Sequence, residues 1–235
     1  MTVSERAAAR THVGLVRDGN EDAYGIEDNA WAVADGLGGH AGGEVASGIA
    51  VESALRTLRQ ADSSDLAAAL GAAFAAAASD VATRAEADPG LADMATTLVL
   101  AVRDAAGEVC VGNIGDSRAY LLSGGELAQV TRDDNIAELL RDRGALTAEQ
   151  ARVHPGQFQL TKALGLGDSE PAVHRLTPAA GRLLLCTDGA NGELSDEQMA
   201  RLLESGTPQE ACERLVTAAL EAGGSDNVTV LVVDL

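Results

Sequence analysis

Four aspartates stand next to glycines or turn residues where short apolar runs begin or end. They are Asp35 before Gly36, Asp116 after Gly115, Asp188 before Gly189, and Asp226 before Asn227. Any one of these pairs alone is typical of an ordinary turn. Glycine lets the backbone come close to a ligand, and a carboxylate beside a bare carbonyl suits a hard divalent cation. Since gathered carboxylates repel one another unless cations lie between them, the repeated design favours one shared metal site.

The donor atoms available here are oxygens, which indicates Mg²⁺ or Mn²⁺ and not zinc. The sequence has neither a His-x-x-x-His motif nor a closely spaced cysteine pair that would favour zinc. Two such ions about 4 Å apart polarise a phosphoryl oxygen and activate water at neutral pH. Arg17 adds a cation that can hold a phosphate through two hydrogen bonds, and Glu21 and Asp22 can hold metal-bound water. The residues alone therefore predict a two-metal phosphoester hydrolase.

The elements that must position these side chains are short strands alternating with pairs of helices. Strands are expected at 10–16, 23–34, 95–103, 108–114, 118–122, 127–131, 182–186 and 228–233. Helices are expected at 44–59, 65–87 (capped by Ser64 or Asp65), 134–143, 147–153, 195–204 and 208–222. Glycines punctuate the four runs after residue 95, which indicates an antiparallel meander. This order favours antiparallel sheets with helices on their outer faces, in one domain over 1–235, with an irregular segment over 132–180 that could cover a site.

Composition and charge limit the partners. The chain of 235 residues is 46% hydrophobic and only 2% aromatic, with a formal net charge of -19 and a pI of about 4.4. This balance argues against nucleic acid or an anionic membrane as a partner. The three cysteines are far apart, no apolar signal segment opens the chain, and the apolar stretch 66–78 is short for a membrane span. We expect a soluble cytoplasmic monomer.

Seven motifs in a fixed order carry a resemblance to a known family. They are Arg-x-x-Asn-Glu-Asp (17–22), Asp-Gly-x-Gly-Gly-His (35–40), Ala-Thr-Thr (95–97), Gly-Asp-Ser-Arg (115–118), Leu-Thr-Lys-Ala-Leu-Gly (160–165), Leu-Cys-Thr-Asp-Gly (185–189) and Gly-Gly-x-Asp-Asn-Val-Thr (223–229). The set resembles the metal-dependent, type 2C protein serine/threonine phosphatases in their bacterial form, over nearly the whole chain. The family fold is an α+β, four-layer αββα sandwich: two stacked antiparallel sheets flanked by pairs of helices, with a flap at about 132–160.

The resemblance also implies a role for each site residue. Asp35 would bridge two metal ions; the carbonyl of Gly36 would bind one of them, and Asp188 and Asp226 would complete the site of the other. Asp116 would form a third metal site together with Asp188. Glu21 and Asp22 would hold metal-bound waters, and Arg17 would clamp the substrate phosphate. The implied cofactors are two or three Mn²⁺ or Mg²⁺ ions. The implied reaction is attack of a metal-bridging water or hydroxide on phosphoserine or phosphothreonine in phosphorylated proteins, without a phosphoenzyme. Cys186 would then be a buried strand residue, and Arg118 a structural ion-pair partner.

Departures from the family pattern leave alternatives open. The start of the flap reads Asp133-Asp134-Asn135, which departs from the family pattern. The stretch from Gly156-Gln157 to Lys162 has two fewer basic groups than that pattern. Leu37 stands where eukaryotic members have a histidine. One alternative is a non-catalytic regulatory relative that binds phosphoprotein without turnover. Another is a phosphatase that serves a stress-response switch by acting on an anti-sigma antagonist. No metal carboxylate is missing, which favours the active enzyme.

Overall fold

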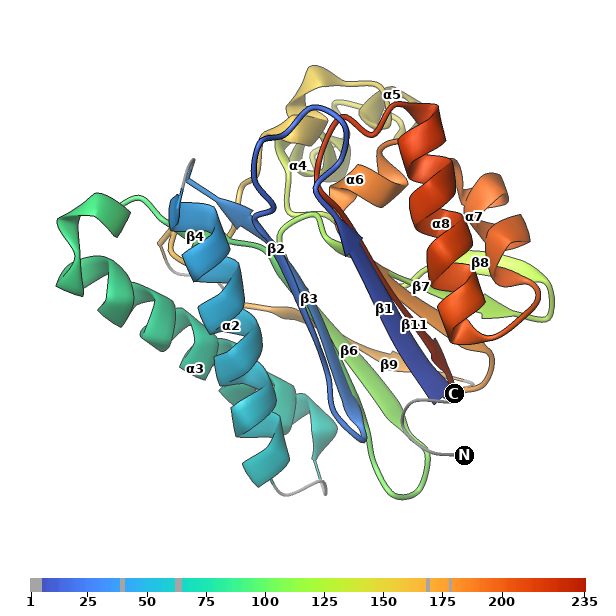
Figure 1. Cartoon of the computed structure of the whole chain (residues 1–235), viewed down its shortest axis with the longest axis horizontal. Coiled ribbons are helices and arrows are strands. Elements are labelled where there is room, and N and C mark those ends of the chain that lie inside the picture. Colours follow the sequence, from blue (N-terminus) through green and yellow to red (C-terminus); the bar gives the residue numbers. More distant parts are fainter. Residues whose placement is uncertain (1–5, 39–40, 62–64, 168–169, 178) are drawn as a thin grey trace.

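Two antiparallel sheets form the centre of the computed structural model, which describes residues 6–38, 41–61, 65–167, 170–177 and 179–235 (Figure 1). The first sheet has the order β1-β11-β10-β7-β8. Its strands are β1 (Ala7–His12), β11 (Val228–Asp234), β10 (Arg182–Cys186), β7 (Arg118–Ser123) and β8 (Glu126–Gln129). The second sheet has the order β2-β3-β5-β6-β9, with β4 paired to β3. Its strands are β2 (Asp22–Ile26), β3 (Ala30–Leu37), β4 (Ala95–Thr96), β5 (Leu98–Arg103), β6 (Val109–Ile114) and β9 (Ala172–Leu176).

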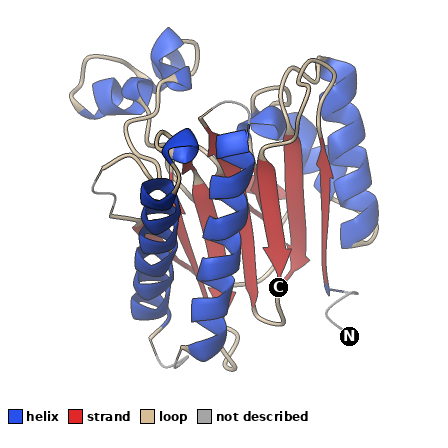
Figure 2. Ribbon diagram, turned by 60° about the vertical axis from the view of Figure 1, so that its left-hand side comes forward, coloured by secondary structure: helices blue, strands red, loops and turns tan. Residues whose placement is uncertain are grey.

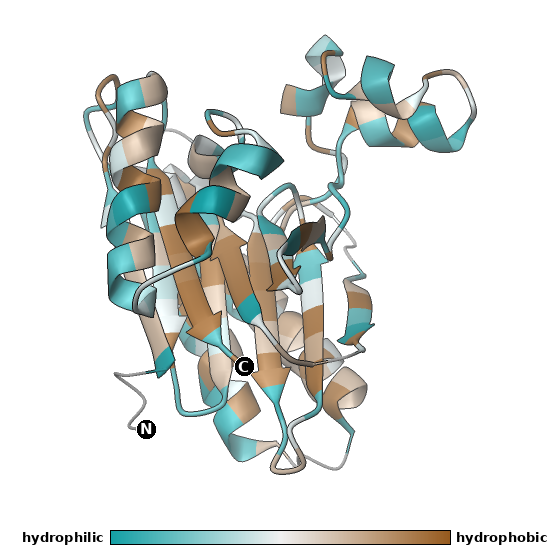
Figure 3. Cartoon of the chain, turned by 90° about the vertical axis from the view of Figure 1, so that its right-hand side faces the viewer, coloured by the Kyte–Doolittle hydropathy of each residue, from teal (hydrophilic) through white to brown (hydrophobic). Residues whose placement is uncertain are grey.

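Alternation along the strands divides the interior into three apolar layers. On β10, Leu183 and Leu185 face the other sheet, whereas Leu184 and Cys186 face the helices outside. On β3, Trp31 belongs to the layer between the sheets, and its neighbouring alanines pack under helices. Small alanines there let the helices approach closely, so a core can form with few aromatics. Figure 3 shows the resulting band of hydrophobic strands between helices with hydrophilic outer faces.

Two long helices cover the second sheet and two others cover the first (Figure 1). The first pair is α2 (Ala41–Gln60) and α3 (Leu66–Ala87); the second is α7 (Asp196–Leu203) and α8 (Pro208–Ala222). Asp65 caps α3 as expected, accepting from Ala67 N at 3.1 Å, while Ser64 lies outside the described residues. Ser195 and Thr207 start α7 and α8 with capping boxes. The four-layer αββα arrangement predicted from the sequence is confirmed (Figure 2).

Helix α3 is a continuous helix of 22 residues, long and apolar enough to cross a membrane by length and composition alone. The expectation that its apolar stretch is too short for a span therefore does not hold for the whole helix. The apolar residues of α3 contribute to the core of the sandwich, since Leu70, Phe74 and Val81 are fully or almost fully buried beside α2. The helix packs on the second sheet as a core helix does.

Several sequence expectations about strands were wrong. The run 23–34 is a hairpin of β2 and β3, turning at 27–29, and β3 continues through the Asp35-Gly36 pair to Leu37. The four runs after residue 95 do not form one meander: β5 and β6 lie in one sheet and β7 and β8 in the other. The crossing is made at Gly115, whose φ of 98° favours glycine. Strand β9 and the short helix α6 (Asp188–Asn191) were not predicted, since β9 is a short edge strand with no apolar run.

The segment 132–160 leaves the sandwich and returns to it. It holds α4 (Ile136–Asp142), α5 (Ala148–Ala151) and the 3-10 turn η2 (Pro155–Phe158), near the two predicted helices. In Figure 1 these elements lie at the end of the molecule where the loop between β1 and β2 turns. The flap is thus placed beside the strand ends that carry the predicted site.

Candidate active site

The apolar layer between the sheets ends in a layer of hydroxyl groups. Thr11 Oγ1 lies 2.7 Å from Thr229 Oγ1, and Thr187 Oγ1 accepts from Thr229 N at 3.0 Å. Across the interior, Thr97 Oγ1 lies 2.7 Å from Ser117 Oγ. These short side chains lie on the strands or directly beside strand ends. They give the carboxylates beyond them polar neighbours in place of an apolar wall.

Asp22 and Asp35 lie directly opposite each other on β2 and β3. Asp35 follows Trp31 and Val33 on the face between the sheets, and its backbone is held by Thr97 on both sides: its N–H donates to Thr97 Oγ1 at 2.9 Å and its carbonyl accepts from Thr97 N at 2.9 Å. Burial raises the pKa of Asp35 well above its ordinary value, and the charges of Asp22 and Asp188 add to this. The geometry therefore suits a carboxylate that is neutralised by a proton or a cation.

Asp22 shares this environment. Its Oδ2 accepts from Thr187 Oγ1 at 2.9 Å, whereas its Oδ1 is buried without a hydrogen-bond partner. Burial raises the pKa of Asp22 to about 7, against the lowering effect of the threonine hydroxyls and with a further rise from Asp188 and Asp226. A buried acceptor with no donor is costly unless something else fills its coordination.

Asp188 and Asp116 complete the acidic cluster from the first sheet's side. Asp188 is the first residue of α6, and its Oδ1 is also buried without a partner. Burial and then the charge of Asp226 raise the pKa of Asp188. Burial followed by the charges of Asp188 and Asp133 raises the pKa of Asp116 to about 8. Burial is the largest cause that raises the pKa of Asp22, Asp35, Asp116 and Asp188, and the charges of neighbouring aspartates add to it, so the cluster attracts cations.

Arg17 enters the site from the loop between β1 and β2. Its Nη2 donates to Asp226 Oδ2 at 2.6 Å, with the arginine side chain 56% exposed. The charge of Asp226, with smaller contributions from Asp35 and Asp188, raises the pKa of Arg17. The guanidinium thus lies at the solvent side of the cluster, where a phosphate would arrive.

Asn227 fixes that loop. Its Nδ2 donates to the carbonyls of Val13 and Gly19, at 2.9 Å each, and its Oδ1 accepts from Glu21 N at 2.8 Å. Asn227 itself is only 6% exposed. Both ends of the Arg17 loop are thereby tied to the start of β11. No role for Asn227 is expected from the sequence; the signal for one is its place within the Asp-Asn-Val-Thr motif, directly after a predicted metal ligand.

Glu21 and Gly36 meet at the start of α2. Gly36 N donates to the Glu21 carbonyl at 3.1 Å, and the Glu21 carboxylate lies against Gly43 in the first turn of α2. A Cβ on Gly36 would lie 2.2 Å from the Gly43 carbonyl oxygen, so only glycine fits. Ser47 Oγ also donates to the Glu21 carbonyl, at 2.6 Å. Close backbone packing is thus one reason for glycine beside Asp35; Gly39 and His40 of the same motif lie outside the described residues.

The base of the flap is joined to the sandwich by a buried ion pair. Arg118 Nε and Nη2 donate to the two carboxylate oxygens of Asp133 at 2.8 and 2.7 Å, and Arg118 Nη1 donates to Tyr120 Oη at 2.8 Å. Burial alone would lower the pKa of Arg118, but the hydrogen bonds and charges of Asp133 and Tyr120 together more than offset this, so the pKa is raised. The structural role expected for Arg118 is confirmed. Asp134 Oδ2 accepts from Gly115 N at 3.1 Å, and Asn135 caps α4. The unusual Asp133-Asp134-Asn135 sequence therefore anchors the flap.

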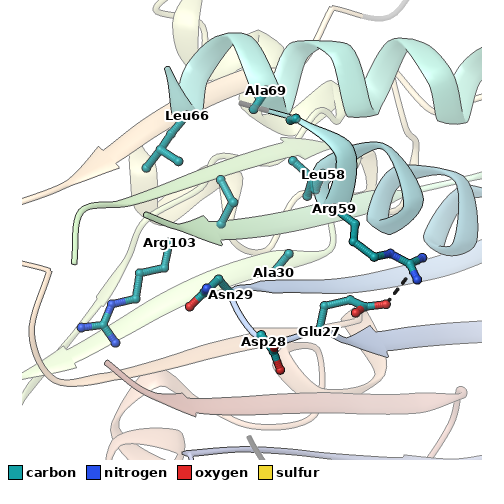
Figure 4. Close-up of a pocket in the computed structure, with 11 residues that line it drawn as sticks. Glu27, Asp28, Asn29, Ala30, Leu58, Arg59, Leu66, Ala69 and Arg103 are labelled. Carbon is teal, nitrogen blue, oxygen red and sulfur yellow. Dashed lines mark ion pairs between the residues drawn. The ribbon is translucent and has the colours of Figure 1, made fainter. Parts of the chain in front are cut away.

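Two cavities differ in their relation to this cluster. One of about 790 Å³ lies between the flap and the helices α6 and α7, and Arg118, Asn135 and Asn191 are among the residues that line it. The other, of about 300 Å³, lies at the far end of the β2–β3 hairpin (Figure 4). Glu27 and Arg59 pair with each other at 3.7 Å there, and Leu66 belongs to its apolar wall. β3 runs from that pocket to Asp35, so the pocket lies at the opposite end of the strand from the carboxylates, whereas the flap cavity is lined by Arg118 and Asn191, which closely follow Asp116 and Asp188 in the chain.

Cys186 sits on β10 two residues before Asp188 and is completely buried. Burial raises the pKa of its thiol to about 12, so it remains a neutral thiol. The expectation that Cys186 is a strand residue and not a nucleophile agrees with this position.

The model of the protein phosphatase 2C family matches residues 11–222. The chain belongs to this family. The crystal structure of the serine/threonine phosphatase PstP of Mycobacterium tuberculosis superposes on this chain with a TM-score of 0.90 at 40% identity, covering 98% of each chain. The catalytic domain of PstP in complex with two manganese ions superposes with a TM-score of 0.88 at 40% identity, covering 97% of each chain.

Sequence relatives extend over the same range. The chain is 41% identical to the M. tuberculosis serine/threonine protein phosphatase PstP over 236 residues, which cover 100% of this chain and 46% of that protein. The chain thus spans about half the length of this 2C relative. It is also 33% identical to the serine/threonine phosphatase Stp of Listeria monocytogenes, over 97% of this chain and 95% of that protein.

The residues of the cluster fit divalent cations of the kind that this family implies. Within the described ranges, no three histidine, cysteine, aspartate or glutamate side chains converge into a closed metal-binding group. The cluster offers instead separate carboxylates with unpartnered buried oxygens on Asp22 and Asp188. Mg²⁺ and Mn²⁺ bind through a few carboxylates and keep several waters, so an open, all-oxygen site suits them. Asp35, Asp116, Asp188 and Asp226 are the side chains that would hold them.

Proposed function

We propose that this chain is a Mn²⁺- or Mg²⁺-dependent protein serine/threonine phosphatase that hydrolyses phosphoserine and phosphothreonine in phosphorylated proteins directly, without a phosphoenzyme. The observation that carries the proposal is the set of mutually repelling carboxylates around Asp35, with buried unpartnered oxygens on Asp22 and Asp188. Its membership of the 2C family and its similarity to PstP and Stp support the same activity.

The chain's own residues divide the work in this proposal. Asp35, Asp188, Asp226 and Asp116, with the Gly36 carbonyl, would hold two ions and a third. When bound, the ions would polarise the phosphoryl oxygens and lower the pKa of the attacking water. Arg17 would hold the phosphate by charge-assisted hydrogen bonds after exchanging part of its contact with Asp226.

Asp22 would orient water beside the cluster. Its Oδ2 is already engaged by Thr187, so its free Oδ1 is the atom that can accept from such a water. The predicted parallel role of Glu21 remains a proposal, and its carboxylate lies against Gly43, toward α2. Cys186 offers no competing nucleophile because its thiol is buried and neutral. The non-catalytic alternative is less well supported, since every carboxylate of the cluster is in place.

Further expectations are proposals of the same kind: a single domain over 1–235 with a flap at 132–160, and a cytoplasmic monomer without nucleic-acid or membrane partners. The net charge of -19 supports the absence of polyanionic partners. The three cysteines are all free and buried, which suits a reducing compartment.

The test is hydrolysis of a phosphothreonine peptide by the purified chain, with Mn²⁺ and with a chelator. Turnover should require metal and vanish in Asp226→Asn. Metal-independent turnover, or unchanged activity of Asp226→Asn, would refute the proposal. Binding of the peptide without any turnover would favour the non-catalytic alternative.

A further inference from the structure

Leu15 and Val16 are large aliphatic residues that are 65% and 70% exposed. In the part of the chain that the structure describes, they are the only sequence neighbours among the exposed large apolar side chains. Isolated exposed apolar residues are ordinary on protein surfaces. Leu15 and Val16 are adjacent and directly precede Arg17, the residue that would hold the phosphate, so their exposure calls for a functional explanation.

The backbone that carries this pair is held firmly. Leu15 N donates to the Gly224 carbonyl at 2.7 Å. Gly14 has a φ of 83°, and a Cβ there would lie 2.2 Å from the Asp226 carbonyl oxygen. Asn227 binds the loop on both sides of the pair, at Val13 and Gly19. The two side chains are therefore presented to solvent by a preorganised loop, which limits the entropy lost when a partner binds.

The position of the pair relative to Arg17 defines what can reach it. Successive Cα atoms are about 3.8 Å apart, and an extended peptide advances about 3.4 Å per residue. A substrate whose phosphate is held at Arg17 and whose chain runs along the β1–β2 loop would place the side chains one or two positions away beside Val16 and Leu15. The other neighbours of that substrate segment include the carboxylates of Asp226 and Asp188, in a chain of net charge -19. Acidic flanking residues are repelled there, and aliphatic ones find an apolar contact.

We infer that Leu15 and Val16 bind an aliphatic side chain that lies within two positions of the phosphorylated residue, so that the chain prefers phosphopeptides with such a neighbour. This inference rests on the proposed function and names the substrate class of the same site. The occupant is part of the substrate, because the apolar pair is continuous with the arginine that would hold its phosphate.

Val16 is the better residue to substitute in a test of this inference. The Leu15 side chain also packs over Gly224 near Leu220, so replacing it disturbs the end of α8. Val16→Ser removes the more exposed aliphatic contact. Val173→Ser is the matched control, since Val173 is 38% exposed on the edge strand β9 of the other sheet.

The experiment compares kcat/KM for phosphothreonine peptides that differ only in having leucine or serine at the positions flanking the phosphothreonine, with Mn²⁺ present. The wild-type chain should prefer the leucine peptides by about fivefold, as expected for partial burial of one aliphatic side chain. Val16→Ser should reduce that ratio to about one, and Val173→Ser should keep the wild-type ratio. Using the ratio cancels any effect on the chemical step that both peptides share.

A wild-type ratio near one, or an unchanged ratio in both Val16→Ser and Leu15→Ser, would overturn the inference. Hydrolysis of p-nitrophenyl phosphate, which has no flanking residues, separates this failure from failure of the proposed function. Normal metal-dependent hydrolysis of that ester without peptide preference refutes only the inference. Absence of hydrolysis of every substrate refutes the proposed function, and the inference with it.

Discussion

Asp22 and Asp35 face each other directly across the antiparallel pair of β2 and β3. Like charges at directly opposite positions destabilise a sheet, and burial adds to the free energy of keeping both ionised. Burial is the largest cause that raises the pKa of each residue. The sheet therefore carries a local electrostatic conflict that a proton or a divalent cation resolves. Function and stability are coupled at this pair.

The first prediction concerns Asp35→Asn. Removing one of the opposed charges should raise the thermal midpoint of the metal-free protein by about 3 °C, since a gain of about 1 kcal/mol shifts a domain of this size by that much. The same change should lower metal-dependent phosphatase activity by about a thousandfold, because bound ions contribute several kcal/mol to the transition state. Thermal melts in chelator and peptide hydrolysis in Mn²⁺ measure the two effects. Asp28→Asn, in the exposed turn of the same hairpin, should change neither; a destabilised but active Asp35→Asn protein would contradict the coupling.

The second prediction concerns pH. The pKa of Asp22 is raised to about 7 and that of Asp116 to about 8. Between the ordinary value of 3.8 and these values the folded chain holds protons that the unfolded chain releases. Raising the pH through this range therefore favours unfolding of the metal-free protein. Its thermal midpoint in chelator should fall from about pH 4 to about pH 8 on account of these groups, if buffers are matched in ionic strength.

Saturating Mn²⁺ should reverse this trend, because metal binding requires the deprotonated carboxylates and stabilises the folded state more as pH rises. The measurement is the difference between the midpoints with metal and with chelator across the same pH series. A difference that shrinks as the pH rises from 5 to 8 would be incompatible with cations bound by these aspartates.

The fold class could be predicted from the sequence because strands, helix pairs and glycine turns alternate clearly. What could not be predicted was which sheet each strand joins. The passage from β6 to β7 through Gly115 reads like any hairpin turn, yet it crosses between the sheets. Pairing between distant segments decides this, as in β11, which follows α8 in the chain but lies between β1 and β10.

In the site too, local features could be predicted from the sequence and contacts between distant residues could not. Asp35 and Asp188 stand out because a carboxylate beside glycine after an apolar run is a local signal. Thr97, Thr187 and Asn227 make hydrogen bonds to site residues that are far away in the chain. Nothing in the local sequence around them indicates which residue each one binds. Asp35 was also expected after a strand, whereas it lies within β3, because pairing with β2 and β4 extends the strand beyond its apolar part.

The third prediction concerns Asn227→Ala. The change leaves two carbonyls and the Glu21 N–H without their partner, which should lower the free energy of unfolding by about 2 kcal/mol. Freed from β11, the Arg17 loop should hold phosphate less well, so KM for phosphopeptides should rise more than kcat falls. Urea denaturation and steady-state kinetics measure these effects. Asn29→Ala, in the exposed hairpin turn, is the control; a large loss of stability with unchanged KM would show that the loop positions Arg17 without Asn227.

The fourth prediction concerns the ion pair that anchors the flap. Arg118→Met leaves Asp133, whose side chain is 7% exposed, without its bidentate partner. Breaking a buried pair from one side should lower the free energy of unfolding by about 3 kcal/mol, because the remaining charge stays desolvated. Adding Asp133→Asn should recover part of that loss, since the amide can still bond with Gln129 and carries no charge. Urea denaturation of the single and double variants measures the coupling, and hydrogen exchange over α4 should be faster in the single variant. Equal stability of the two variants would mean that the buried charge of Asp133 does not determine the loss.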